Sequence, residues 1–309
     1  MITIFKSTNH RLETVNTLTE GCWVNVINPS EQEVAQVESL GIPPDFVTHS
    51  LDIDERARME RSNGSVLIVL RLPYFQGRMV PIPYITVPLG IILTDTLIVT
   101  ICREETCVIQ EFAAGHVHDL STVKKNRFVL QLLLRTADRY LSYLRDVDAA
   151  VDTLEEKLHR SLQNKEVREL LKYQKSLVYF TTALKSNELM LERLQKSQLF
   201  QAHPEDVDLL DDVLIEIRQA IEVTAISENI LSQMMDAFAS IISNNLNVVM
   251  KFLTSMTIVI SLPTLIASFY GMNVRLPGQD HPYAFPLTML VSLMISLIVV
   301  IIFWKKEWL

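Results

Sequence analysis

Residues 252–270 read FLTSMTIVISLPTLIASFY, and Gly271-Met272-Asn273 follows directly. The run contains 19 residues without a charge, close to the ~20 that an α-helix needs to cross a bilayer. A glycine, a flexible thioether and an amide then end it. The pattern predicts a membrane-spanning helix. It also indicates a functional role for the asparagine that follows the end of this helix.

A second uncharged run covers residues 285–304 and reads FPLTMLVSLMISLIVVIIFW. Only 14 residues separate the two runs, so they predict a helical hairpin rather than two independent domains. Lys251 precedes the first run, and Lys305 and Lys306 follow the second. Because basic residues favour the cytoplasmic side, we expect a multi-pass protein of the cell membrane with both termini in the cytoplasm.

The first membrane run continues a much longer helical segment. No proline occurs between Pro204 and Pro263, and the next glycine is Gly271, which predicts one helix over 204–270. Its 67 residues would extend roughly 100 Å, too long for a globular domain and suited to a stalk. Apolar residues at steps of three and four form its seam, which fits packing within one subunit or between subunits equally: Leu210, Leu214, Ile217, Ile221, Leu231, Met235, Phe238 and Ile242.

The rest of the chain divides into a region with helical sequence patterns and a region that mixes β-rich and helical patterns. Residues 126–162 and 165–198 lack proline and glycine and predict an antiparallel helical hairpin. Before them, β-rich runs alternate with helical ones: strands over 22–27, 65–72, 85–93 and 96–102, and helices over 31–40 and 106–114. We therefore expect a cytoplasmic α/β domain (1–125), a helical hairpin (126–203), the cytoplasmic part of a stalk (204–250) and a two-span membrane domain with a short external loop (251–309).

Composition and motifs exclude several classes of function. Residues 247–309 hold four of the 28 basic and two of the 36 acidic side chains, so residues 1–246 carry a net charge of −10. This acidic part argues against nucleic acid as a partner and suits cations. The sequence contains no phosphate-binding glycine loop and no nucleophile–base set, so neither nucleotide chemistry nor an enzyme is expected. Cys22, Cys102 and Cys107 are expected to be reduced core thiols. No signal peptide is expected in MITIFKSTNH.

Hydroxyl groups follow one face of the first membrane helix. They recur at steps of three and four, with Ser255 off the face: Thr254, Thr257, Ser261, Thr264 and Ser268. The same face extends through Met250, Asn247 and Asp236 in one direction and towards Asn273 in the other. A polar face on an apolar membrane helix meets either a partner helix or water. Because one hairpin cannot enclose a pore, the second interpretation requires a homo-oligomer.

Gly271-Met272-Asn273 after the penultimate span, two C-terminal spans, and the ending WKKEWL together resemble the CorA family of divalent-cation (magnesium) transporters. The resemblance covers essentially the whole chain. It implies a funnel-shaped homopentamer with a selectivity filter at Gly271, Met272 and Asn273. The pore-lining positions that it implies, on or beside the hydroxyl face, are Asp236, Asn247, Met250, Leu253, Ser261 and Thr264, and the face itself adds Thr257.

The resemblance also implies cytoplasmic sites between subunits where internal metal closes the channel. One acidic ligand falls on Asp212, with Asp211 adjacent. The α/β domain has Asn63 and Ser65 where its partner acid is expected, so Glu60 or Asp54-Glu55 would have to substitute. A solvated acidic face is the alternative interpretation of these residues.

The external loop departs from the family pattern. Family loops often carry several acids, whereas this loop has Asp280 as its acidic residue, beside Arg275 and His281. Zinc-transporting relatives share the architecture, so a Zn²⁺ transporter, with or without proton coupling, is the first alternative. A membrane-anchored cytoplasmic adaptor is the second.

The expected function is passive, gated import of Mg²⁺, with Co²⁺ or Ni²⁺ as further ions. Mg²⁺ releases its waters reluctantly, so a ring of Asn273 amide oxygens, aided by the Gly271 carbonyl, would hold the hydrated ion. Asn273 acting only as a helix cap is the alternative. Rings of Met250 and Leu253 would close the path by dewetting. A potential of 100 mV supplies about 4.6 kcal/mol per divalent ion, so no nucleotide is needed.

Overall fold

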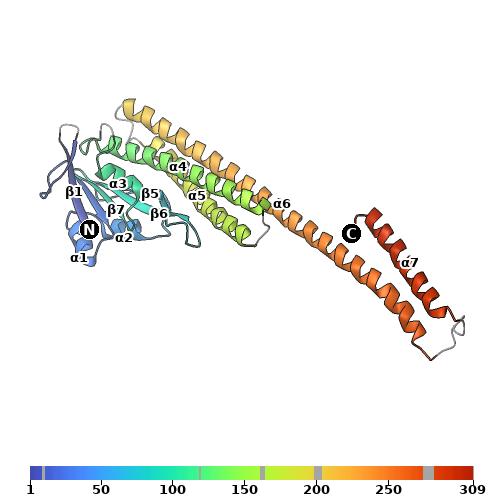
Figure 1. Cartoon of the computed structure of the whole chain (residues 1–309). Helices are drawn as coiled ribbons and strands as arrows, with labels where there is room; N and C mark the ends of the chain where they lie inside the picture. The colour runs from blue at the N-terminus through green and yellow to red at the C-terminus, as the bar shows by residue number, and fades with distance from the viewer. Residues whose placement is uncertain (9–10, 118–119, 161–163, 198–203, 274–281, 309) are drawn as a thin grey trace. The chain divides into compact units, whose positions relative to one another are not determined.

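The structure is a computed structural model that describes residues 1–8, 11–117, 120–160, 164–197, 204–273 and 282–308 (Figure 1). The chain forms two compact units, Met1–Gln233 and Met234–Leu309, and one long helix contributes residues to both.

The first unit begins with β1 (Ile2–Thr8), β2 (Arg11–Thr14), β3 (Trp23–Ile27), α1 (Glu31–Glu38) and α2 (Pro44–Leu51). Four further strands follow: β4 (Arg58–Ser62), β5 (Ser65–Phe75), β6 (Tyr84–Leu93) and β7 (Ile98–Cys102). The helices are then α3 (Cys107–Ala113), α4 (Lys125–Arg160), α5 (Asn164–Lys196) and α6 (Pro204–Tyr270), and α7 (Ala284–Lys305) lies wholly in the second unit.

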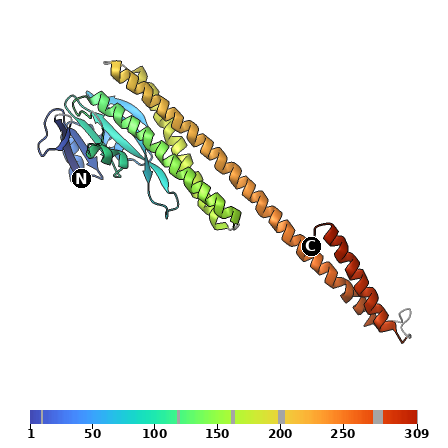
Figure 2. The ribbon, with the colours of Figure 1, turned by 45° about the horizontal axis from the view of Figure 1, so that its top comes forward.

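The strands form one mixed sheet in the order β2-β1-β3-β7-β6-β5-β4. β3 and β7 run parallel, and the other neighbouring pairs are antiparallel. The residues of β6 and β7 are almost all buried because helices cover both faces of the sheet. Figures 1 and 2 show the sheet between the short helices α1 and α2 and the long pair α4 and α5.

An aromatic layer joins the sheet to the long helices. Trp23 on β3 is fully buried and packs against Phe112 of α3 and Phe128 of α4, with ring centroids 6.4 and 5.2 Å away. Its indole N–H donates to Thr100 Oγ1 at 2.8 Å, so the buried polar atom is satisfied. The opposite face of the sheet holds an aliphatic core with Phe46 of α2.

The elements predicted from periodicity are confirmed, and four others were not predicted. The predicted strands correspond to β3, β5, β6 and β7, and the predicted helices to α1, α3, α4, α5, α6 and α7. The sequence did not indicate β1, β2, β4 or α2. β4 (RMERS) is too charged to read as a strand, yet it pairs with β5 at the sheet edge through a turn at Asn63 (φ 50°) and Gly64 (φ 79°).

The cysteine prediction is wrong for one residue. Cys22 and Cys102 are buried, but Cys107 is exposed at the start of α3. The buried face of α3 consists of Val108, Ile109 and Phe112, and Cys107, the first residue of the helix, lies outside this face.

Within the first unit, α6 packs against α4 and α5 through the predicted seam. Leu210, Leu214 and Ile217 are buried in the same chain. Polar contacts at the rim add to this packing, among them Arg218 Nε donating to Glu188 Oε1 at 2.9 Å and Ser227 Oγ donating to Asp148 Oδ1 at 2.8 Å. For residues 210–217, packing within the subunit accounts for the seam.

In the second unit, α6 and α7 are both long and apolar enough to cross a membrane. Pro263 lies inside α6, and the helix continues past it to Tyr270. Ser255 of α6 and Ser292 of α7 are buried, whereas most apolar side chains of both helices are exposed. Exposed apolar side chains on a helical hairpin suit lipid or further copies of the helix rather than water.

Candidate functional site

The hydroxyl face of α6 is exposed in the single chain, and Thr264 also borders a hollow shared with Thr288 of α7. Thr254, Thr257, Ser261, Thr264 and Ser268 are all exposed in the single chain. Ser255, which helical spacing placed off this face, is fully buried. The second helix of the hairpin thus covers one side of α6 and leaves the hydroxyl-bearing side open.

Three of the hydroxyl protons on this face are used inside the helix. Thr257 Oγ1 donates to Leu253 O at 2.8 Å, Ser261 Oγ to Ile258 O at 2.9 Å, and Thr264 Oγ1 to Ile260 O at 3.0 Å. A hydroxyl that donates inward keeps its oxygen lone pairs for an outside partner. The face therefore presents hydrogen-bond acceptors, which suit a cation or the water molecules around one. Thr257, Ser261, Thr264 and Ser268 also line a shallow surface groove that reaches Met272.

The predicted filter lies at the end of this face. α6 ends at Tyr270, and Gly271 N donates to Ala267 O at 3.1 Å and to Ser268 O at 3.2 Å. Asn273 is exposed and is absent from the positive-φ positions, so it does not adopt the left-handed cap conformation of a helix C-terminus. Backbone capping of that kind is therefore no reason for an asparagine here.

Gly271 is not required by its own chain. Its φ is not positive, and an added Cβ would meet Ser268 O at 3.5 Å and Ala267 O at 3.6 Å, which are ordinary contacts. Nothing within the described part of the chain demands a glycine at this position. A glycine at position 271 would be required if another subunit or an ion approached its backbone closely.

The other predicted pore positions on α6 share this exposure. Asp236, Asn247, Met250 and Leu253 are all exposed, the last two with 53 and 52 % of their surface accessible. Two large apolar side chains are thus exposed beside a row of polar ones. Such a face suits contact with a second copy of the helix or the lining of an axial pore.

The predicted regulatory acids do not form a metal site within one chain. Asp211 and Asp212 are exposed on α6, and Asp211 Oδ1 accepts a bond from Gln195 Nε2 at 2.8 Å. Across the residues that the structure describes, no group of three or more His, Cys, Asp and Glu side chains is close enough to hold a metal ion. A site at these acids would need ligands from another subunit.

The acids considered as substitutes in the α/β domain differ in availability. Arg58 pairs with Glu60 Oε2 at 2.6 Å and with Glu55 Oε1 at 2.9 Å, so both carboxylates are engaged. Asp54 is exposed. Ser65 is buried at the start of β5.

The acid expected in the external loop falls outside the described residues. Asp280, with Arg275 and His281, lies in 274–281, which the structure does not describe.

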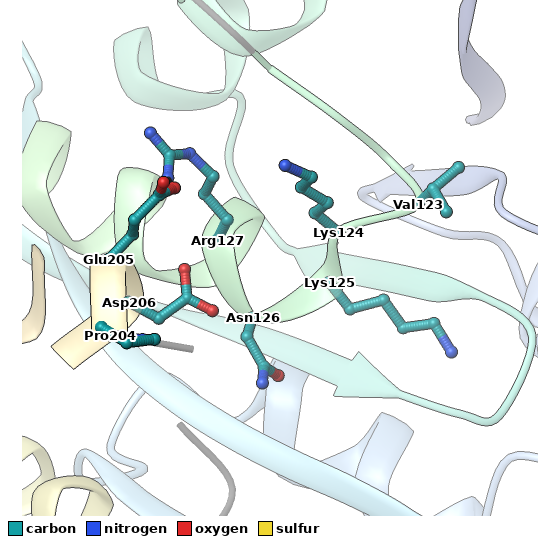
Figure 3. Close-up of a pocket in the computed structure, with 8 residues that line it drawn as sticks. All are labelled: Val123, Lys124, Lys125, Asn126, Arg127, Pro204, Glu205 and Asp206. Atoms are coloured by element: carbon teal, nitrogen blue, oxygen red, sulfur yellow. Dashed lines mark hydrogen bonds and ion pairs between the residues drawn. The ribbon is translucent and has the colours of Figure 1, made fainter. Parts of the chain in front are cut away.

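A hollow in the first unit lies where the N-termini of α4 and α6 meet (Figure 3). Two of its cationic side chains are engaged: Arg127 pairs with Glu205 at 3.1 Å, and Lys125 Nζ donates to the backbone carbonyls Thr94 O at 2.7 Å and Asp95 O at 2.5 Å. Asp206 is buried beside two helix N-termini, where a negative charge is stabilised. These contacts give the hollow a structural role.

Comparison with known proteins gives one consistent result. The sequence model of the family described as CorA-like Mg²⁺ transporter protein matches residues 19–306. The "Cobalt/magnesium transport protein CorA" of Methanocaldococcus jannaschii is 28 % identical over 297 residues, which cover 93 % of this chain and 90 % of the relative. The protein of the same name from Thermotoga maritima is 25 % identical over 293 residues, covering 93 and 83 %.

A solved structure agrees in fold. "The complete structure of CorA magnesium transporter from Methanocaldococcus jannaschii" superposes with a TM-score of 0.87, at 24 % identity, and covers 100 % of this chain and 99 % of that one. The likeness extends over both compact units.

Proposed function

The chain belongs to the family of CorA-like Mg²⁺ transporter proteins, and from this premise we propose that it moves divalent cations across a membrane, Mg²⁺ above all. The family is one of transporters, so the chain is not an enzyme. The relatives' names add Co²⁺ as a second transported ion. Transport is passive, gated and directed into the cell.

One observation supports this proposal most: the uncovered face of α6 that carries acceptor oxygens and ends at exposed Asn273. A single hairpin leaves this face open on one side. Several copies around an axis would close it into a conduit, with five as the number that the family implies. The hydroxyl oxygens then face the ion path, and the filter lies at its mouth.

The chemistry of the filter suits a hydrated ion. Mg²⁺ prefers octahedral oxygen ligands and loses its waters slowly, so a ring of amide oxygens can hold the ion through its water shell. A neutral amide also releases the ion faster than a carboxylate would. The membrane potential supplies about 4.6 kcal/mol per 100 mV for a divalent ion. This corresponds to a gradient of over a thousandfold.

Gating follows from the apolar positions. Met250 and Leu253 form rings that exclude water when the copies stand close together. Internal Mg²⁺ holds the closed state by bridging Asp212, with Asp211, to an acid of a neighbouring subunit, of which exposed Asp54 is the available candidate. The flanking lysines favour a cell-membrane protein with both termini in the cytoplasm.

The test is ion flux into vesicles that contain the purified protein, compared for wild type and Asn273→Ala with Mg²⁺, Co²⁺, Ni²⁺ and Zn²⁺. We expect the variant to lose most Mg²⁺ flux and its preference among ions. Thr264→Val should reduce flux because it removes an acceptor from the face. Thr288→Val is the matched control: Thr288 Oγ1 donates to Ala284 O at 2.7 Å in the same manner, but on α7.

Each outcome separates the alternatives. Uptake of Zn²⁺ alone, at a rate that rises with a proton gradient, would identify the protein as a Zn²⁺ transporter rather than a Mg²⁺ transporter. Absence of ion flux in the wild type as well as in Asn273→Ala, in a particle that is not pentameric by native mass, would favour the membrane-anchored adaptor. For regulation, Asp212→Ala should weaken inhibition by internal Mg²⁺, and inhibition equal to wild type would remove that role.

A further inference from the structure

The chain after α7 is held in a defined turn. Glu307 adopts a left-handed φ of 56°, and Trp308 N donates back to Phe303 O at 2.9 Å. The rings of Phe303 and Trp308 stack with centroids 5.5 Å apart. This closure resembles a Schellman motif, and it fixes the backbone of Lys305 and Lys306 at the end of the helix.

A buried hydroxyl joins this turn to α6. Ser255 Oγ donates to Lys251 O at 2.7 Å and lies 3.5 Å from Trp308 O. Ser255 is fully buried, so the contact is part of the packing between the two helices. Lys251, Lys305 and Lys306, more than fifty residues apart in sequence, are therefore gathered at one end of the hairpin; we call them the basic cluster.

The side chains of the basic cluster and its turn carry a net positive charge that has no ion-pair partner among the described residues. All three lysines are exposed, and none forms an ion pair with an acid among the described residues. Glu307 is the acidic residue of the turn, which leaves a net charge of +2. Trp304, with 72 % of its surface exposed, lies beside the cluster, and tryptophan is favoured at the level of lipid headgroups.

We infer that the basic cluster is a binding site for the headgroup of an anionic phospholipid. The apolar surfaces of α6 and α7 end at this cluster, so the phosphate of an adjoining lipid lies at the level of the lysines. Lysine ammonium groups bind phosphate as point charges and need no bidentate geometry. A zwitterionic headgroup carries its own cation, which opposes the cluster, so a lipid with net negative charge is preferred. The inference requires only that the two helices lie in a bilayer, and it does not rest on ion transport.

The tryptophans of this chain suit a direct measurement. Two of the three, Trp304 and Trp308, lie at the basic cluster, and Trp23 is fully buried in the first unit. Lipids brominated on their acyl chains quench nearby tryptophan fluorescence. The full-length protein is reconstituted in mixtures of brominated and ordinary phosphatidylglycerol or phosphatidylcholine, and the quenching yields the relative binding constant. Each net charge near an anionic surface is worth about fivefold, so we expect about 25-fold preference for phosphatidylglycerol at low ionic strength.

Charge variants decide the outcome. Lys251→Gln/Lys305→Gln/Lys306→Gln should abolish the preference, and the corresponding triple Arg variant should keep it. Lys157→Gln/Lys175→Gln/Lys185→Gln removes the same charge from exposed positions of the first unit and should leave the preference unchanged. Equal quenching by both lipids in the wild type, or a preference that survives in the cluster variant, would overturn the inference. So would loss of the preference on adding inorganic phosphate but not on adding chloride at the same ionic strength, because the site would then bind free phosphate rather than lipid.

Discussion

Replacing Gly90 by alanine tests how closely α2 lies on the sheet. Gly90 is in the middle of β6, paired with Val69 of β5 and Ile101 of β7. A Cβ at Gly90 would lie 1.7 Å from Ser50 Oγ and 2.4 Å from Ser50 Cβ. Ser50 is fully buried, and its hydroxyl donates to Phe46 O at 2.6 Å. Glycine in a central strand here marks close approach of a helix.

The magnitude follows from these distances. Carbon atoms approach to about 3.5 Å, so α2 must retreat by roughly 1 Å to admit the new methyl group. Overpacking of a well-packed core costs about 1–3 kcal/mol. We expect the upper end, because rotating the Ser50 hydroxyl away would leave its Cβ in the clash. The retreat also loosens Phe46 and Val47, which are buried on α2.

The assay is chemical unfolding of the full-length protein, followed by the fluorescence of Trp23 in a background where Trp304 and Trp308 are phenylalanine. Gly90→Ala should lower the free energy of unfolding by about 3 kcal/mol. Ser50→Gly removes both clashing atoms at a cost of about 1 kcal/mol for a helical glycine. In that background Gly90→Ala should cost under about 1 kcal/mol, giving a coupling energy of about 2 kcal/mol.

Two results would refute the reasoning. A cost for Gly90→Ala below about 0.5 kcal/mol would mean that α2 does not pack at the distance described. An unchanged cost in the Ser50→Gly background would mean that the clash is with another residue.

Asn187 is fully buried and bonds both Arg71 backbone groups, accepting from N at 3.0 Å and donating to O at 2.9 Å. Asn187→Ala should therefore cost about 1–3 kcal/mol in the same unfolding assay, while exposed Thr182→Ala should cost little. Burial raises the pKa of Cys102 to about 12, so its thiol stays protonated between pH 7 and 9. A maleimide should then modify Cys107 alone in the native protein and all three cysteines after unfolding, as counted by mass spectrometry; native labelling of Cys102 that rises over this pH range would contradict the packing of β7. Met250→Ser and Leu253→Ser should each raise Mg²⁺ flux under closing concentrations of internal Mg²⁺, because a polar ring no longer dewets. Met294→Ser, at a similarly exposed position of α7, should leave that flux unchanged, and equal flux in all three variants would argue against an apolar gate.

The sequence alone determined the long helices and the face of α6 that carries the hydroxyls. The intervals between prolines and glycines predicted α4, α5 and α6, and steps of three and four separated Ser255 from Thr257, Ser261 and Thr264. These features are local, because a helix converts spacing along the chain directly into a face. The motif at Gly271-Met272-Asn273 indicated the family in the same way, from adjacent residues.

The tertiary structure decided what meets those faces. Only the packed hairpin shows that Ser255 contacts the backbone of Trp308 and that Lys251 lies near Lys305. Likewise, the charged strand β4 exists because β5 offers it a partner edge, and its own composition does not predict a strand. Such contacts join residues far apart in sequence, and their free energy depends on the partner as much as on the residue itself, so no pattern within one segment encodes them.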